Sequence, residues 1–338
     1  MTSKNLNCRV NKPFLLAPAG KDYLWGGTRL KEAYGKHLPM EPLAESWECS
    51  VHPDGVSLVA SGAYQGKSLS QVLLEHPEFL GTHPASTNGG EMPILIKLID
   101  AKEDLSIQVH PDDAYAHIYE NGSLGKTEMW YVLEANPDAH LIYGFHRDIT
   151  REELQKSLEQ GNIEKYLQKI PVHKDDVFFI EPGCIHAIGA GVVIAEIQES
   201  SNVTYRLFDY HRVDKNGKAR ELHLEKGLAV ANLKSSAEPR QPLRVLRYRK
   251  GYATELLGRC RYFQVERMLV NTKDYNPVAE LQTGSNSFKV LLCTEGAGRM
   301  AVTGEEELPF GKGDCIFIPA SSVMLQLQGK AQFLMTSC

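Results

Sequence analysis

The chain has 338 residues, of which 42% are hydrophobic, and its formal net charge at pH 7 is -5. This length suffices for about two domains with a large core, and the composition excludes a disordered chain. The acidic balance gives no basis for binding nucleic acid or an anionic membrane.

No apolar run reaches the roughly 18 residues that a membrane span needs. The first residues lack the apolar segment of a secretory signal. The seven cysteines form no CxxC pair, which favours reduced thiols over a disulfide framework. We therefore expect a cytoplasmic protein without a membrane or nucleic-acid partner, and the oligomeric state stays open.

Two segments carry helix signals. Ser68 precedes a predicted helix over 69–80 that is interrupted near Pro77. Thr150 and Glu153 form a capping box before a helical pattern that ends near residue 167 and is broken at Gly161. Elsewhere short runs rich in β-branched and aromatic residues predict strands at 129–133, 140–143, 177–180, 192–197, 262–270, 288–293, 315–318 and 324–327. Many strands at this spacing predict a mainly β protein built from sandwiches or barrels.

Residues 175–186 and 312–323 resemble each other: each has an acidic turn, an apolar strand and a proline. His186 in the first copy corresponds to Val323 in the second. Such a repeat predicts two related β-domains. We place a metal-binding domain with a helical insertion near 150–170 in residues 1–238, and a metal-free domain in residues 239–338. The basic, proline-marked stretch 239–250 begins the linker, and its charge indicates a solvated surface.

The richest stretch for chemistry is 105–113. Gln108 and His110 lie two apart on a predicted strand and so share one face. Glu128 begins an apolar strand, where a charge needs a partner, and His186 follows a Pro-Gly turn. A lone histidine is more often a surface or core residue than a ligand. Together, however, these four side chains form a nitrogen and oxygen set that suits Zn²⁺ with one position open.

Several motifs carry a family resemblance: Trp25-Gly-Gly, Ala44-Glu-Ser-Trp-Glu48, Ser106-Ile-Gln-Val-His-Pro-Asp-Asp113, Gly125-Lys-Thr-Glu-Met-Trp-Tyr131, Pro182-Gly-Cys-Ile-His186 and Asn202-Val-Thr-Tyr-Arg206. They resemble type I mannose-6-phosphate isomerases of the short bacterial form, in that family's order. The last hundred residues resemble its second β-domain in general pattern only. The resemblance implies two cupin-like jelly rolls with a small helical insertion, one zinc ion held by Gln108, His110, Glu128 and His186, and a hexose 6-phosphate substrate.

The resemblance also places the catalytic arginine at Arg206. An aldose–ketose isomerase needs a base, a stabiliser for the developing oxyanion and a phosphate anchor, and a guanidinium suits the second task. A structural salt bridge is the alternative for this arginine. Glu196, in an apolar strand, and Lys126 are both candidates for the base; we favour Glu196 for proton transfer and Lys126 as a cation. Further phosphate candidates are Ser106, Lys97 and Arg212.

These residues predict a zinc-dependent isomerase that interconverts mannose 6-phosphate and fructose 6-phosphate through an enediol-type intermediate. Two other readings stay open. One is a non-catalytic cupin that binds a phosphosugar, and the other is a metal-dependent cupin oxygenase or epimerase.

Overall fold

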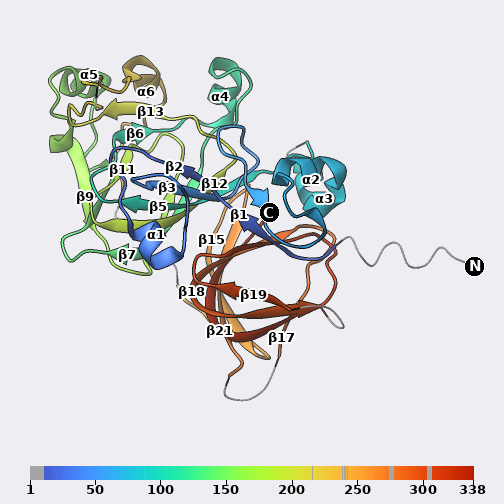
Figure 1. Cartoon of the computed structure of the whole chain (residues 1–338). Coiled ribbons are helices and arrows are strands. Elements are labelled where there is room, and N and C mark those ends of the chain that lie inside the picture. Colours follow the sequence, from blue (N-terminus) through green and yellow to red (C-terminus); the bar gives the residue numbers. More distant parts are fainter. Residues whose placement is uncertain are drawn as a thin grey trace, which may run out of the picture.

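The structure is a computed structural model that describes residues 11–87, 89–214, 216–237, 239, 241, 243–273, 278–302 and 307–338. Three antiparallel sheets dominate it, which confirms the predicted mainly β fold. Figure 1 shows the strands of the last third of the chain, in orange and red, curving below the two sheets of the first part. Within the described residues, no helix is both long and apolar enough to cross a bilayer.

A six-stranded sheet forms the centre of the molecule. Two of its three eight-residue strands, Ile94–Ala101 and Val192–Glu199, are buried along their whole length, so apolar residues occupy both of their faces. In spatial order the strands are β10 (Val177–Ile180), β7 (Glu128–Ala135), β12 (Val192–Glu199), β5 (Ile94–Ala101), β3 (Glu45–Cys49) and β2 (Ala19–Lys21).

A five-stranded sheet packs against one face of the six-stranded sheet. Its outer face packs against helices α5 and α6, as the close approach of Gly227 to Leu207 and Val109 shows. In spatial order the strands are β13 (Tyr205–Phe208), β6 (Ile107–Val109), β11 (His186–Ile188), β8 (His140–Phe145) and β9 (Leu167–Pro171).

The ten-stranded sheet combines the end of the chain with its beginning. Residue Phe14 of β1 pairs with Phe317 of β20, about three hundred positions away. The main path is β14 (Arg247–Arg249), β15 (Tyr252–Arg259), β16 (Gln264–Asn271), β21 (Leu325–Ser337), β18 (Lys289–Val302), β20 (Cys315–Ile318), β1 (Phe14–Ala17) and β4 (Leu58–Val59), with β17 (Ala279–Leu281) on β21 and β19 (Leu308–Gly311) on β18. The division of the chain at residues 238 and 239 stays a prediction.

The helices are short and lie at the periphery (Figure 1). The capping boxes at Ser68 and Thr150 are both formed, with Gln71 and Glu153 as reciprocal partners. The break at Gly161 is present too, and a 3₁₀ turn rather than an α-helix follows it. The helical elements are α1 (Arg29–Tyr34), η2 (Gly62–Tyr64), α2 (Leu69–Glu75), η3 (Pro77–Leu80), α3 (Thr82–Thr87), α4 (Asp113–Tyr119), α5 (Arg151–Glu159), η4 (Ile163–Tyr166) and α6 (Leu224–Val230).

Alternation along the strands divides the buried side chains between separate cores. Along β7, for example, Met129 and Tyr131 point to the core shared with the ten-stranded sheet, while Trp130 and Val132 point to the five-stranded sheet. Polar residues in phase with Trp130 therefore face the space between the two sheets of the first part.

Candidate active site

Three adjacent strands of the six-stranded sheet direct charged side chains into that space. The register pairs Glu196 of β12 with Lys97 of β5 on one side and with Trp130 of β7 on the other. Glu128 lies two residues before Trp130 and so on the same face. All four side chains are buried. Since buried charges need partners, this face must meet complementary groups.

The five-stranded sheet supplies those groups. Gln108 of β6 pairs directly with His186 of β11 and with Arg206 of β13. Residues directly opposite each other in antiparallel strands share a face. The side chains of Gln108, His186 and Arg206 therefore lie in one row. His110 follows two positions later, and its backbone carbonyl accepts a hydrogen bond from Gly183 of the Pro-Gly turn, at 2.9 Å.

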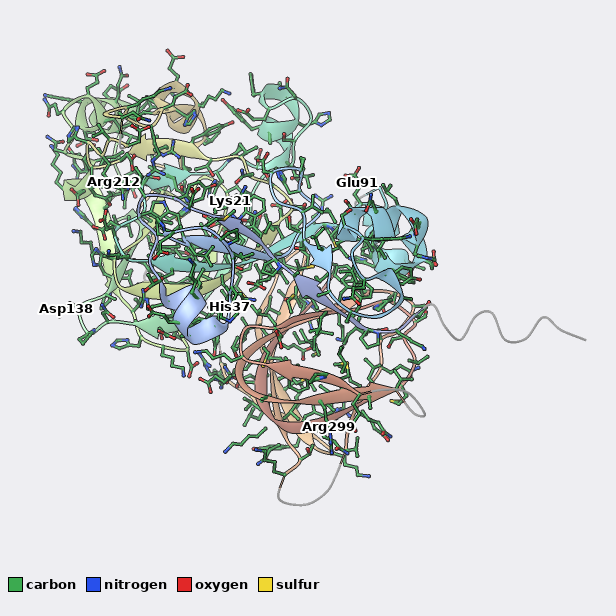
Figure 2. All side chains as sticks on the ribbon, in the orientation of Figure 1. Lys21, His37, Glu91, Asp138, Arg212 and Arg299 are labelled. Carbon is green, nitrogen blue, oxygen red and sulfur yellow. The ribbon has the colours of Figure 1, made fainter. Side chains whose placement is uncertain are left out.

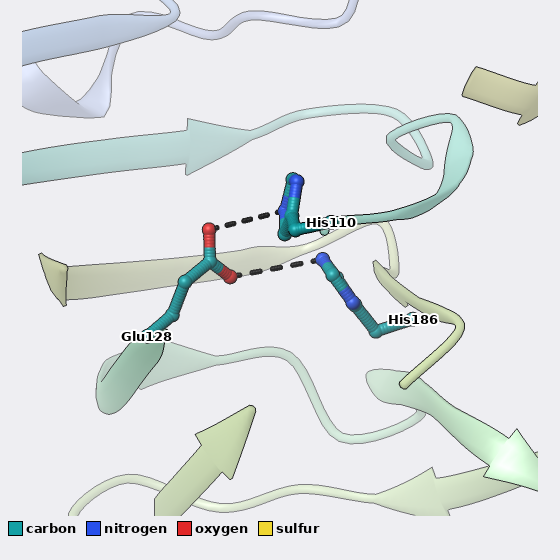
Figure 3. A group of neighbouring side chains, drawn as sticks. All are labelled: His110, Glu128 and His186. Atoms are coloured by element: carbon teal, nitrogen blue, oxygen red, sulfur yellow. Dashed lines mark ion pairs between the residues drawn. The ribbon is translucent and has the colours of Figure 1, made fainter. Parts of the chain in front are cut away.

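His110, Glu128 and His186 form a compact cluster (Figure 3). One ligand atom from each lies within 4.8 Å of the others. Nε2 of His110 is 3.3 Å from Oε1 of Glu128, and Nε2 of His186 is 3.7 Å from Oε2. The amide nitrogen of Gln108 lies 3.3 Å from Nε2 of His186; a half-turn of the amide would present its oxygen instead. The four residues predicted as ligands thus meet at one place.

Hydrogen bonds fix the orientation of both imidazoles. Nδ1 of His110 donates to the carbonyl of Val203 at 2.8 Å, and Nδ1 of His186 donates to the carbonyl of Cys184 at 2.9 Å. Because a carbonyl only accepts, Nδ1 carries the proton and Nε2 presents its lone pair toward Glu128. Burial, and for His110 also the nearby Lys126, lowers the pKa of His110 to about 3 and lowers the pKa of His186. Both rings are therefore neutral near pH 7.

The carboxylate of Glu128 completes the donor set. Burial is the largest influence and opposes its ionisation, but the ammonium of Lys126 and the contacts with His110 and His186 together outweigh burial and hold the pKa of Glu128 well below its usual value. Lys126 forms an ion pair with Glu128 and lies 3.4 Å from Nε2 of His110. Neither oxygen of Glu128 has a hydrogen bond of good geometry within the described chain. Two neutral imidazole nitrogens facing such an anion fit a divalent metal ion.

Glu196 lies beside this cluster in a pocket of its own. Its Oε2 accepts a hydrogen bond from the indole nitrogen of Trp130 at 2.9 Å, and its Oε1 lies 3.1 Å from Nζ of Lys97. Burial and the charge of Glu128 raise the pKa of Glu196. Burial opposes the charge of Lys97, but Glu196 and Glu45 outweigh it and raise the pKa of Lys97. The structure thus places Lys97, predicted as a phosphate candidate, against the candidate base.

Arg206 lies at the end of the row and is half-buried. Its Nη1 donates to the carbonyl of Glu221 at 2.9 Å, and its buried Nε has no partner. Within the described chain it makes no ion pair with a carboxylate, so the salt-bridge alternative has no partner there. Burial, and next the charge of Arg220, lower the pKa of Arg206. Arg206 therefore keeps donors available for an anion.

Two further arginines stand near Arg206. Arg212 and Arg220 both pair with Asp209, the first at 2.7 Å. Arg212, a predicted phosphate candidate, is also labelled in Figure 2. The remaining candidate, Ser106, is buried at 4% exposure. The three guanidiniums outnumber the one carboxylate between them, so this end of the site is positively charged.

A cavity of about 720 Å³ borders the site without including the cluster. Val203 and His223 line it, and these residues hydrogen-bond His110 and the backbone of Arg206. Other lining residues include Asp54, Glu120, Asn202 and Lys226.

The sequence analysis missed three contributors. Trp130, which binds Glu196, lies inside a quoted motif, and its spacing of two from Glu128 would have revealed it. The carbonyl groups of Val203 and Cys184 orient the imidazoles, and no residue type signals a backbone contact.

Comparisons with known proteins cover nearly the whole chain. The family profile described as "Phosphomannose isomerase type I, catalytic domain" matches residues 14–124, and "Mannose-6-phosphate isomerase, cupin domain" matches residues 253–337. The second match confirms the cupin-like character predicted for the fold.

Individual relatives point to the same family as the two profiles. Mannose-6-phosphate isomerase ManA of Bacillus subtilis is 37% identical over 97% of this chain and 99% of its own length. Mannose-6-phosphate isomerase of Streptococcus mutans is 36% identical over 96% of this chain and 97% of its own. The crystal structure of mannose 6-phosphate isomerase from Bacillus subtilis superposes with a TM-score of 0.87 at 34% identity, covering 97% of this chain and 99% of that one. The chain therefore belongs to the type I mannose-6-phosphate isomerase family of aldose–ketose isomerases, as the sequence motifs predicted.

Proposed function

We propose that the chain is a zinc-dependent isomerase that interconverts mannose 6-phosphate and fructose 6-phosphate through an enediol-type intermediate. One observation carries the proposal: two neutral imidazoles and the carboxylate that pairs with Lys126 meet beside a buried glutamate whose pKa is raised, and Arg206 lies opposite Gln108 in the same row. The names of the full-length relatives support the substrate pair. We also propose that it acts in the cytoplasm, which the free thiols of the six described cysteines support.

The metal would be held by Gln108, His110, Glu128 and His186. When bound, zinc supplies a Lewis acid that polarises the oxygens of the sugar. The chain itself prepares the donors: carbonyl groups hold each imidazole in the tautomer that leaves Nε2 free.

Glu196 is the residue we assign to proton transfer. The reaction removes a proton from C2 of the aldose and delivers one to C1, while a hydroxyl proton moves between O2 and O1. A carboxyl whose pKa is raised by burial is a stronger base than an exposed one, which suits it to accept a proton and return it. Trp130 and Lys97 each bind one oxygen of Glu196 and so hold its orientation.

Arg206 and Lys126 supply positive charge. We assign the guanidinium of Arg206 to share the negative charge that develops on the sugar oxygens, because its Nε has no hydrogen-bond partner among the described residues. Lys126 neutralises Glu128 and adds a second cation beside the cluster. Arg212 lies at the positively charged end of the site, which suits a phosphate anchor.

The test is a coupled assay with mannose 6-phosphate, run before and after dialysis against a chelator. Activity should disappear with the metal and return when Zn²⁺ is added. Metal analysis of the purified protein should find about one zinc per chain. Full turnover by metal-free protein would contradict the proposal, and iron as the bound metal would favour an oxygenase.

Arg206→Ala separates an isomerase from a non-catalytic phosphosugar binder. Loss of one charge-stabilising donor should lower kcat about 10²- to 10³-fold, with zinc content unchanged. Arg299→Ala is the control, because Arg299 lies on β18 of the ten-stranded sheet, where it contacts Gln328 and Glu307. Unchanged turnover in Arg206→Ala would remove Arg206 from the mechanism.

A further inference from the structure

The turn between β15 and β16 reaches from the last third of the chain to the segment that follows His110. Tyr262, in this turn, donates a hydrogen bond from its hydroxyl to Oδ2 of Asp113, the first residue of α4, at 2.6 Å. The next residue, Phe263, is 2% exposed and packs against Phe179 with ring centroids 6.1 Å apart. The turn is therefore held in place independently of the Tyr262 hydroxyl.

Asp113 also binds the far end of the segment that runs from α4 to Gly125. Its Oδ1 accepts a hydrogen bond from the amide of Gly125 at 2.9 Å, and the amide of Lys126 donates to the carbonyl of Pro111 at 3.1 Å. A Cβ at Gly125 would lie 2.5 Å from the backbone of Asp112 and Asp113, so the approach requires glycine. These contacts close the loop between His110 on one side and Lys126 with Glu128 on the other.

Glu199, at the end of β12, joins the same group. Its Oε1 accepts the amide of Thr127 at 2.7 Å, and its buried Oε2 has no donor within the described residues. The carboxyl groups of Glu199 and Asp113 share a hydrogen bond, with Glu199 as the neutral partner. Burial, and next the charge of Asp113, raise the pKa of Glu199 to about 8. The other ionisable groups facing this pair are Tyr262, Arg261 and Cys260, all from the β15–β16 turn.

We propose that Tyr262 is a positioning residue for the isomerase: through Asp113 and Gly125 it holds the segment that places Lys126 and Glu128 opposite His110. This inference rests on the proposed function for its effect on turnover. Tyr262 makes no contact with the cluster itself. The last third of the chain would thus contribute to catalysis without supplying a ligand.

Tyr262→Phe tests the proposal, because it removes only the hydroxyl and leaves the packed ring. A small displacement of catalytic groups is costly, so kcat should fall about tenfold while KM changes less than about twofold. Hydrogen exchange of the segment 122–130 should become faster, since the amide of Gly125 loses its fixed acceptor. Tyr248→Phe is the control, as Tyr248 lies on β14 and is 78% exposed. Wild-type kcat and exchange in Tyr262→Phe would overturn the proposal.

A second variant tests the protonation state of Glu199. Below pH 8 the neutral Glu199 donates to Asp113; as pH rises through 8, ionisation places two carboxylates side by side and breaks their shared hydrogen bond. Wild-type kcat should therefore decline from pH 8 to 9, with faster exchange at 122–130. Glu199→Gln keeps a neutral donor and should abolish that decline. An identical decline in Glu199→Gln would count against the network. If the wild type proved inactive, the proposed function would fail, while the exchange experiments would still decide the role of Tyr262.

Discussion

The interiors of the two β regions of the chain differ in the charged side chains that they hold. Between the six- and five-stranded sheets lie Lys97, Lys126, Glu128 and Glu196, all at most 3% exposed. The interior of the ten-stranded sheet is a continuous apolar core that includes Met268, Leu291, Phe310, Ile316, Leu327 and Phe333. Burying charged groups generally stabilises a protein no more than apolar packing does, and often less. The contrast teaches that the first region keeps its charges for chemistry and that the second can be optimised for packing.

The repeated strands make this comparison specific. β10 pairs with β7 and β20 pairs with β18, although β10 is the edge of its sheet and β20 also pairs with β1. After β10 the chain turns into His186 of the metal cluster, whereas after β20 it reaches Val323, which packs against the apolar core. The same local pattern thus leads to a proposed metal ligand in one region and to a packing residue in the other.

Glu128→Gln should have the largest effect on metal binding and kcat in the first region. It removes the anion between the two imidazoles and leaves Lys126 buried without its partner, so we expect loss of bound zinc and a fall in kcat of about 10³-fold or more. Zinc analysis and the coupled assay measure both effects. Glu134→Gln on the same strand is the control, because that side chain is 35% exposed and pairs with Lys312. A variant that kept its zinc and most of its activity would refute the ligand assignment.

Glu196→Gln should have the next largest effect. The amide cannot transfer a proton, so kcat should fall about 10²-fold or more while zinc stays bound. Glu255 offers a matched control in the second region: it is 1% exposed and pairs with Arg267 at 2.6 Å. Glu255→Gln should lower the free energy of unfolding by about 2 kcal/mol and leave kcat unchanged. If Glu196→Gln and Glu255→Gln lowered kcat equally, the carboxylate of Glu196 would serve stability and not proton transfer.

Acid should destabilise the first region through His110. The pKa of His110 is about 3 in the folded chain and about 6.5 in an unfolded one. Below pH 6.5 the unfolded chain therefore binds a proton that the folded chain does not, and stability falls as pH falls toward 3, by at most about 1.4 kcal/mol per pH unit. Urea unfolding of metal-free protein at pH 8, 6.5 and 5 measures this slope. His110→Gln should make the slope shallower, and an unchanged slope would exclude His110 as its source.

The sequence could predict what depends on local pattern. The spacing of two between Gln108 and His110 predicted a shared face, and the strands at 177–180 and 315–318 have the bounds that their apolar runs indicated. The capping box at Thr150 likewise marked the start of a helix. These features depend on residues a few positions apart, so they can be read without the fold.

Other parts depend on pairing between distant segments. Arg206 shares a face with Gln108 because β13 pairs with β6 in the register that sets these two residues opposite each other. β1 joins the ten-stranded sheet through β20, at the other end of the chain. The sequence analysis also did not predict helix α4, because its start signal, the Asp112 cap on Tyr115, lies within the motif examined for metal ligands.

Ile316→Val in β20 should have the smallest effect of these variants. It tests whether the second region contributes packing alone. Ile316 is completely buried in the apolar core, and removing one methylene from such a site costs about 1 kcal/mol of unfolding free energy. This core shares no residue with the cluster of His110, Glu128 and His186, so kcat per folded molecule should equal that of the wild type. Urea unfolding and the coupled assay, run on the same preparation, separate the two quantities. A fall in kcat larger than the loss of folded protein would show that packing inside the ten-stranded sheet also sets the geometry of the site, and the division between a chemical and a packing region would then no longer hold.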